Sequence, residues 1–225
     1  IRRFSPATVS YYFLVVLVLC KSMASLFYGV FGLLMIKFIK PKAQIRLALL
    51  LVVLALLYPT MSIMKIFPHQ QLMNVATSIS AERAQSLGFR FENEDILLEH
   101  GREKFFFGWG GWGRNRVYNE ESGRDESTTD GRWIITFGQF GIFGFIAEFG
   151  LLAIAVIRAS QAAKLVKSKE ELTLLSAHAL LVGIIMIDQL PNSSLSPWLW
   201  LLIGVLIGRA DDILFKGKTV NYLLK

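Results

Sequence analysis

Long apolar runs alternate with short charged segments along this chain. Four of the runs lie in the middle and C-terminal parts: Ile45–Phe67, Trp133–Ile157, Leu172–Leu190 and Pro197–Ile207. The first two are long enough to cross a hydrocarbon core about 30 Å thick as helices. The last two form a pair joined by the short turn Pro191–Ser196. Because a helix satisfies its own backbone hydrogen bonds in lipid, the pattern predicts an all-α, polytopic membrane protein.

The N-terminal apolar run divides into two helices. Residues Ala7–Ile36 are uncharged except for Lys21. As a single helix they would be about 45 Å long, which is too long for one crossing. The pattern therefore predicts two short helices that meet near Lys21–Ser22, and about five or six transmembrane helices in all.

Charge gives the chain an orientation. Lys37–Arg46 and Arg158–Lys169 are basic and contain no acidic residue, and the tail from residue 216 is also basic. Short basic loops stay in the cytoplasm, so the long segment between the two main runs faces outward. We expect membrane helices over residues 1–66 and 133–215, a large extracytoplasmic (periplasmic) loop over 67–132, and a cytoplasmic tail over 216–225.

Composition supports the membrane class and excludes several others. Hydrophobic residues make up 53% of the chain and the mean hydropathy is +0.48, above the usual range of a soluble domain. The net charge of +7 comes from juxtamembrane clusters, so we expect no nucleic-acid partner. The single cysteine and three scattered histidines give no metal-ligand spacing, and no cofactor motif is present. Because the chain begins at Ile1, we expect it to be the C-terminal part of a longer protein.

The outer segment contains an aromatic and glycine block, Phe105–Gly113, which reads FFFGWGGWG. Its glycines satisfy G-x-G-x-x-G, but a dinucleotide site also needs a βαβ unit, which a loop between membrane helices does not provide. Two interpretations stay open. Trp109 and Trp112 can anchor the segment at the lipid headgroups, or their faces can stack on sugar rings.

Charged residues in the same segment include several candidates for chemistry. The pattern predicts a helix over Arg90–Lys104, in which Arg90 and Glu94 are spaced to pair, and an irregular loop over Tyr118–Gly131. Arg90 is suited to bidentate phosphate binding, whereas Arg102, Lys104 and Arg124 are expected to pair with acids on a solvated surface. Asp130 immediately precedes a membrane helix, where its simplest role is that of an N-cap.

These motifs together resemble the O-antigen ligase and polymerase family of bacterial envelope proteins, multi-spanning glycosyltransferases of the GT-C type. The resemblance rests on Arg90 opening a helical segment, on Phe107–Gly110, and on the run from Trp133 that reads WIITFGQFGIFGF. It covers most of Ile45–Ile157.

The resemblance implies a bacterial inner-membrane enzyme that needs no metal. Such an enzyme joins a glycan from an undecaprenyl-diphosphate-linked donor to a second lipid-linked glycan or to a lipid A core acceptor. It implies that Arg90, with Arg83, Arg114 or Arg116, binds the diphosphate. Ligases of the family usually have a His-Asn type motif where this chain has Thr129–Gly131. Asp130 takes that position, and the departure favours a polymerase over a lipid A core ligase.

Two other functions remain open on the sequence. A transporter or flippase subunit for lipid-linked sugar would need ionisable residues along a membrane path, and only Glu148, His178 and Asp188 are available. A non-catalytic envelope assembly protein would use the outer segment to bind a partner.

Overall fold

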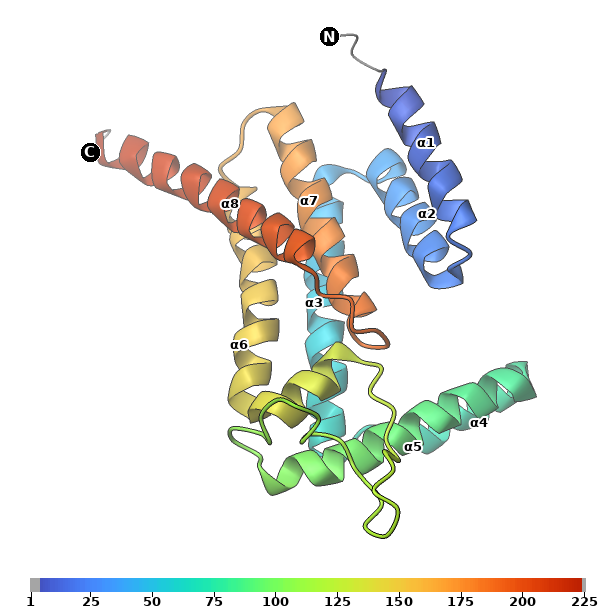
Figure 1. The fold of residues 1–225 in the computed structure, drawn as a ribbon. Helices are drawn as coiled ribbons and strands as arrows, with labels where there is room; N and C mark the ends of the chain where they lie inside the picture. Colours follow the sequence, from blue (N-terminus) through green and yellow to red (C-terminus); the bar gives the residue numbers. More distant parts are fainter. Residues whose placement is uncertain (1–4, 224–225) are drawn as a thin grey trace.

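The computed structural model describes residues 5–223, apart from the side chains of Pro6, Arg83 and residues 218–223. Over this range the protein is all-α (Figure 1). Its helices are α1 (Pro6–Leu19), α2 (Met23–Phe38), α3 (Pro41–Ile63), α4 (His69–Ile79), α5 (Ala81–Glu103), α6 (Arg132–Ala162), α7 (Lys169–Asp188) and α8 (Pro197–Leu223). The all-α class is confirmed. Of the five or six membrane helices expected, three described helices are long and apolar enough to span a membrane, and α1 and α2 are shorter apolar helices.

Three helices, α3, α6 and α7, are long and apolar enough to cross a membrane. They pack side by side and, with α8, form the core, in which Phe149, Leu152 and Val182 are buried. Helices α3 and α7 approach closely, since a Cβ atom on Gly183 would lie 3.2 Å from the Ala48 backbone. Small residues permit such backbone approach in membrane bundles. The predicted runs match these three helices to within a few residues.

Helices α1 and α2 form a hairpin beside α7 (Figure 1). The helices are 14 and 16 residues long and break at Lys21, which has a positive φ of 51°. The prediction of two short helices meeting near Lys21–Ser22 is therefore confirmed. Buried Gln44 of α3 ties the hairpin to the bundle, because its amide donates to carbonyl oxygens at the end of α2, including that of Ile39 at 2.8 Å.

Helix α8 is longer than the apolar run predicts. It continues beyond Ile207 to Leu223, through the residues expected to begin a cytoplasmic tail. Its polar half is held against α6 by Arg158, whose Nε donates to Asp211 at 2.7 Å. Hydropathy cannot detect this extension, since the charged residues are compensated by a tertiary contact.

The large loop expected over residues 67–132 is not seen within the described residues. Helices α4 and α5 occupy most of its first half. Helix α5 lies across the lower ends of α3 and α6, and α4 packs alongside α5 (Figure 1). The remainder folds back on α6 and includes a short hairpin closed by a bridge between Tyr118 and Asp125. Thus the predicted Arg90–Lys104 helix is the second half of a helix that begins at Ala81.

Helix α6 is broken at Gly141, where φ is 64° and ψ is −162°. The break frees backbone groups, and the aromatic and glycine block supplies their partners. Trp109 N donates to Gly138 O (2.8 Å), Gly110 N donates to Gln139 O (2.8 Å), and Ile142 N donates to Phe105 O (2.8 Å). Satisfying these groups is what permits an irregular backbone in a membrane-embedded helix.

Candidate functional site

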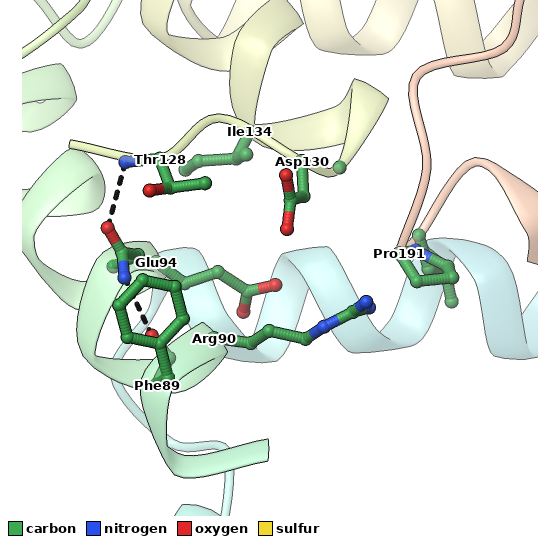
Figure 2. A pocket seen from close by; sticks show the side chains of 10 residues that line it. Phe89, Arg90, Glu94, Thr128, Asp130, Ile134 and Pro191 are labelled. Carbon is green, nitrogen blue, oxygen red and sulfur yellow. Dashed lines mark hydrogen bonds between the residues drawn. The ribbon is translucent and has the colours of Figure 1, made fainter. Parts of the chain in front are cut away.

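A small pocket of about 20 Å³ lies where α5 meets the start of α6 and the turn between α7 and α8 (Figure 2). Helix α5 contributes Phe89, Arg90, Asn93 and Glu94. The opposite wall consists of Thr128, Asp130, Gly131, Ile134, Leu190 and Pro191. Figure 2 shows the side chains of Arg90, Glu94 and Asp130 directed into the same space. Arg90 and Asp130, the two residues proposed from the sequence as catalytic, therefore line one pocket.

Two local arrangements hold the walls together. Asn93 is buried, and its side-chain oxygen accepts a hydrogen bond from the Thr128 backbone N–H at 2.8 Å. This bond holds the segment that contains Asp130 against α5. Gly131 then passes the α7–α8 turn so closely that a Cβ atom would lie 2.3 Å from Leu190 O. The Arg132 N–H reaches the same turn and donates to Gln189 O at 3.0 Å.

Asp130 does not cap α6 in this structure. The N-cap is Gly131, and no side chain caps the first turn. Among the described residues, the Asp130 carboxylate accepts no hydrogen bond and forms no ion pair. The simplest sequence-based role is thus not observed, and the carboxylate is exposed toward the pocket.

Arg90 is also unpaired. It is exposed, and within the described part of the chain it makes no hydrogen bond or ion pair, so the expected i,i+4 pair with Glu94 does not form. A guanidinium with free donors beside a carboxylate with free acceptors is suited to binding a ligand that carries both anionic and hydroxyl groups.

Glu94 is a member of the pocket that the sequence did not identify. Its carboxylate accepts a short hydrogen bond from the Tyr58 hydroxyl of α3. Burial raises the pKa of Glu94 to about 7, and the Asp95 charge acts in the same direction, whereas the Tyr58 hydroxyl and the Arg90 charge lower it. The indole N–H of Trp133 also favours the ionised form, although it makes no hydrogen bond of acceptable geometry.

An apolar groove adjoins the pocket and shares Arg90, Glu94, Leu190 and Pro191 with it. The groove has a volume of about 260 Å³, and its remaining lining is Tyr58, Phe67, Leu72, Leu87 and Phe91. It runs between α4, α5 and the end of α3. The polar pocket and the apolar groove together are suited to a ligand with a charged head and a hydrocarbon tail.

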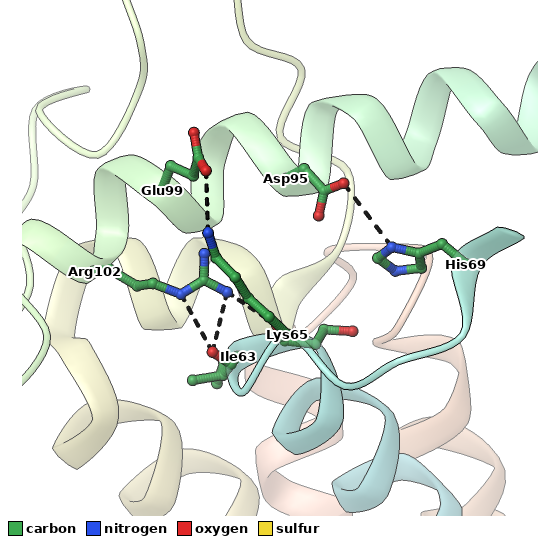
Figure 3. Close-up of polar contacts among 7 residues, drawn as sticks. Ile63, Lys65, His69, Asp95, Glu99 and Arg102 are labelled. Atoms are coloured by element: carbon green, nitrogen blue, oxygen red, sulfur yellow. Dashed lines mark hydrogen bonds and ion pairs between the residues drawn. The ribbon is translucent and has the colours of Figure 1, made fainter.

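A second, polar pocket lies on another side of α5 (Figure 3). Lys65 Nζ lies 3.2 Å from Glu99, and His69 Nδ1 lies 3.9 Å from Asp95. Arg102 donates to the carbonyl oxygens of Ile63 (3.0 Å) and Ser62 (3.1 Å) at the end of α3. The expectation that Arg102 pairs with acids on the surface is wrong, because this guanidinium satisfies the unpaired carbonyls of a helix C-terminus.

The other candidates from the sequence lie outside the pocket at Arg90. Arg116 is ion-paired with Asp125 at 2.5 Å, and Arg114 Nε donates to Gly111 O at 3.2 Å. Trp109 stacks on His100 with centroids 4.4 Å apart, whereas Trp112 is 98% exposed. The side chain of Arg83 lies outside the described residues.

Two ionisable residues of the membrane helices, Glu148 and Asp188, are engaged in structural contacts. Glu148 binds Arg132 through two hydrogen bonds of 2.6 and 2.8 Å and accepts a third from Thr136. Asp188 accepts from Asn192 (2.7 Å) and Ser194 (2.8 Å) and so fixes the α7–α8 turn. His178 Nε2 is buried and has no hydrogen-bond partner within the described part of the chain.

The arrangement is that of a helical membrane protein whose polar pocket lies at one end of its spanning helices. The family model of the O-antigen ligases matches residues 8–149, more than half of the chain, so the protein belongs to the O-antigen ligase family. The matched segment contains Arg90, Glu94 and Asp130. Comparisons with curated proteins and with solved structures gave no match.

Proposed function

We propose that this protein is a glycosyltransferase that joins an undecaprenyl-diphosphate-linked glycan to a lipid-linked glycan or a lipid A core acceptor. The observation that carries the proposal is the shared pocket of Arg90 and Asp130 in a chain of the O-antigen ligase family. Neither side chain makes a hydrogen bond or ion pair among the described residues, as expected of groups that bind substrate.

In the reaction, Arg90 binds the diphosphate of the donor. The bond between the sugar C1 and the diphosphate oxygen breaks, and its electron pair stays on the diphosphate as the acceptor hydroxyl oxygen bonds to C1. A guanidinium stabilises the developing negative charge through two parallel hydrogen bonds. Asp130 accepts the proton that the acceptor hydroxyl loses. The adjoining groove would hold the first isoprene units of the carrier, since its lining is apolar.

We further propose that the protein lies in the bacterial inner membrane with the pocket on the periplasmic side. The basic segments Lys37–Arg46 and Arg158–Lys169 lie at the end of the bundle opposite α5 (Figure 1). The positive-inside rule assigns that end to the cytoplasm. On this proposal residues 1–66 and 133–215 are membrane helices, 67–132 form the periplasmic part and 216–225 are cytoplasmic.

Apart from Arg83, the remaining arginines and tryptophans are proposed to contact the glycan and the lipid, and not the reacting atoms. Exposed Trp112 is available to stack on a sugar ring or to enter the headgroup layer. Trp109, Arg114 and Arg116 belong to the folded block that holds the α6 break, so their contribution includes shaping the surface. Arg83 is kept as a diphosphate-binding candidate.

The experiment that tests the function is reconstitution of the full-length protein in liposomes with an undecaprenyl-diphosphate-linked glycan and an acceptor. Thin-layer and gel analysis then follow released undecaprenyl diphosphate and glycan length together. Release with transfer to a second undecaprenyl-linked unit means a polymerase, and transfer to lipid A core means a ligase. If the lipid-linked glycan only changes leaflet, the protein is a flippase. If wild-type protein releases no undecaprenyl diphosphate with either acceptor, the proposal is wrong.

A further inference from the structure

Glu94 lies close to Arg90, so an ionised Glu94 carboxylate would repel a diphosphate bound there. It follows Arg90 by one helical turn on α5 and lines both the pocket and the apolar groove. Several groups face the Glu94 carboxyl. They are Tyr58 from α3, Arg90 and Asp95 from α5, Asp130 from the segment before α6, and the uncharged Trp133 from α6. Arg90 supplies the single positive charge in this set.

We propose that Glu94 takes part in the reaction as a neutral carboxylic acid that donates a hydrogen bond to the diphosphate beside Arg90. The inference rests on the proposed function, because it concerns the same substrate. Glu94 lines the pocket, and its Oε2 accepts from Tyr58, which leaves Oε1 to carry the proton in this proposal.

The electrostatics of the pocket supply the reason. Burial already raises the pKa of Glu94 to about 7, and an adjacent diphosphate raises it further. Binding of the diphosphate is therefore coupled to protonation of Glu94. Asp130, which is exposed, acts as the base in the proposed reaction. The two carboxyl groups of the pocket thus have different roles: Glu94 donates a hydrogen bond and Asp130 accepts a proton.

The atoms balance without a second proton transfer. The proton of Glu94 stays on Glu94 when the sugar C1–O bond breaks, the electron pair of that bond stays on the diphosphate oxygen, and the acceptor proton moves to Asp130. After product release, Asp130 loses its proton to water. Glu94 needs to change its protonation state only when the diphosphate enters or leaves.

The test is a titration of undecaprenyl diphosphate binding by the full-length protein in nanodiscs between pH 5.5 and 9. For wild type we expect the affinity to fall above pH 7 by as much as tenfold per pH unit. Glu94→Gln keeps a neutral donor, so its affinity at pH 9 should exceed that of wild type by at least tenfold, while the two proteins differ less than threefold at pH 5.5. The ionisation of the ligand itself is common to both proteins and cancels in the ratio.

Two further variants make the result specific. Tyr58→Phe removes a hydrogen bond that favours ionised Glu94, so the loss of affinity should move to higher pH. Glu92→Gln removes an exposed carboxylate from the same helix and should leave the wild-type profile unchanged. If Glu94→Gln does not fold, the shift in Tyr58→Phe still decides the matter.

Two outcomes overturn the inference in different ways. Equal pH profiles in wild type and Glu94→Gln, or an unshifted profile in Tyr58→Phe, would show that Glu94 does not meet the diphosphate, and the proposed function would stand. A wild-type protein that binds no undecaprenyl diphosphate at any pH would overturn the proposed function together with the inference.

Discussion

The backbone of Gly141 passes that of Phe106 so closely that a Cβ atom on Gly141 would lie 2.3 Å from the carbonyl carbon of Phe106. The contact joins the aromatic and glycine block to the break in α6. Gly108 makes the reciprocal approach, with a Cβ position 2.4 Å from the carbonyl carbon of Gln139. The glycines that carry the family resemblance therefore have a structural role, in which two segments exchange backbone hydrogen bonds at a distance that excludes side chains.

We predict that Gly141→Ala lowers the yield and thermal stability of the folded protein. Its φ of 64° and ψ of −162° fall in a region that is essentially restricted to glycine, where another residue costs about 1 to 3 kcal/mol before the clash with Phe106 is added. The measurement is thermal unfolding in detergent, followed by size-exclusion chromatography. Gly150→Ala is the matched control, because it lies in the same helix with nothing within 4 Å of its Cβ position. Equal melting temperatures for both variants would contradict the role given to the break.

How far the sequence could predict this structure depends on whether a feature is local. Helices α3, α6 and α7 follow directly from apolar runs, since the bilayer sets their length. The break at Lys21 was predictable because one charge divides a run that is too long. Helix α4 and the first half of α5 were not predicted. No residue of α4 is buried, and its position depends on its contact with α5, which in turn packs on α6.

The site was predicted in part for the same reason. Arg90 and Asp130 were chosen by residue type and by position relative to neighbouring helices, and the structure brings them to one pocket. Glu94 was interpreted as a local partner of Arg90. Its actual partner, Tyr58, lies 36 residues away in the sequence, and no local pattern reports such a contact. Arg102 was misinterpreted in the same way, because its acceptors are carbonyl oxygens 39 and 40 residues away.

A prediction on topology tests the periplasmic assignment of the pocket. In a Cys20→Ser background, Glu121→Cys should react with a membrane-impermeant thiol reagent in intact spheroplasts, and Lys167→Cys should react only after lysis. Both positions are exposed in the structure, so access within the fold is not limiting. Gel-shift labelling with a maleimide reports the result. Labelling of Lys167→Cys alone in intact spheroplasts would invert the orientation.

Arg90 offers a test of bidentate phosphate binding. We expect both Arg90→Ala and Arg90→Lys to abolish polymer or ligated glycan, because lysine provides a point charge without the planar pair of donors. Protein level and melting temperature should stay at wild-type values, since Arg90 makes no hydrogen bond or ion pair within the described residues. The readout is a glycan gel with a quantitative immunoblot. Arg124→Ala, which changes an exposed arginine outside the pocket, should leave glycan unchanged. Full activity in Arg90→Lys would show that a charge suffices.

The role of Asp130 is decided by a single isosteric change. Asp130→Asn keeps the size of the side chain and removes its basicity, and loss of a general base costs about 100- to 10,000-fold in rate. The folded state should be unaffected, because the N-cap of α6 is Gly131 and the Asp130 carboxylate has no hydrogen bond to lose among the described residues. We therefore expect a normal amount of protein, normal binding of undecaprenyl diphosphate through Arg90, and accumulation of unpolymerised undecaprenyl-linked repeat units measured by mass spectrometry of extracted lipids.

Glu120→Gln, an exposed carboxylate in the same segment, serves as the control and should give wild-type chain lengths. Wild-type chain lengths in Asp130→Asn as well would exclude Asp130 as the base. The search would then move to the carboxylates of the neighbouring polar pocket, Asp95 and Glu99, which face the end of α3 from the same helix that carries Arg90.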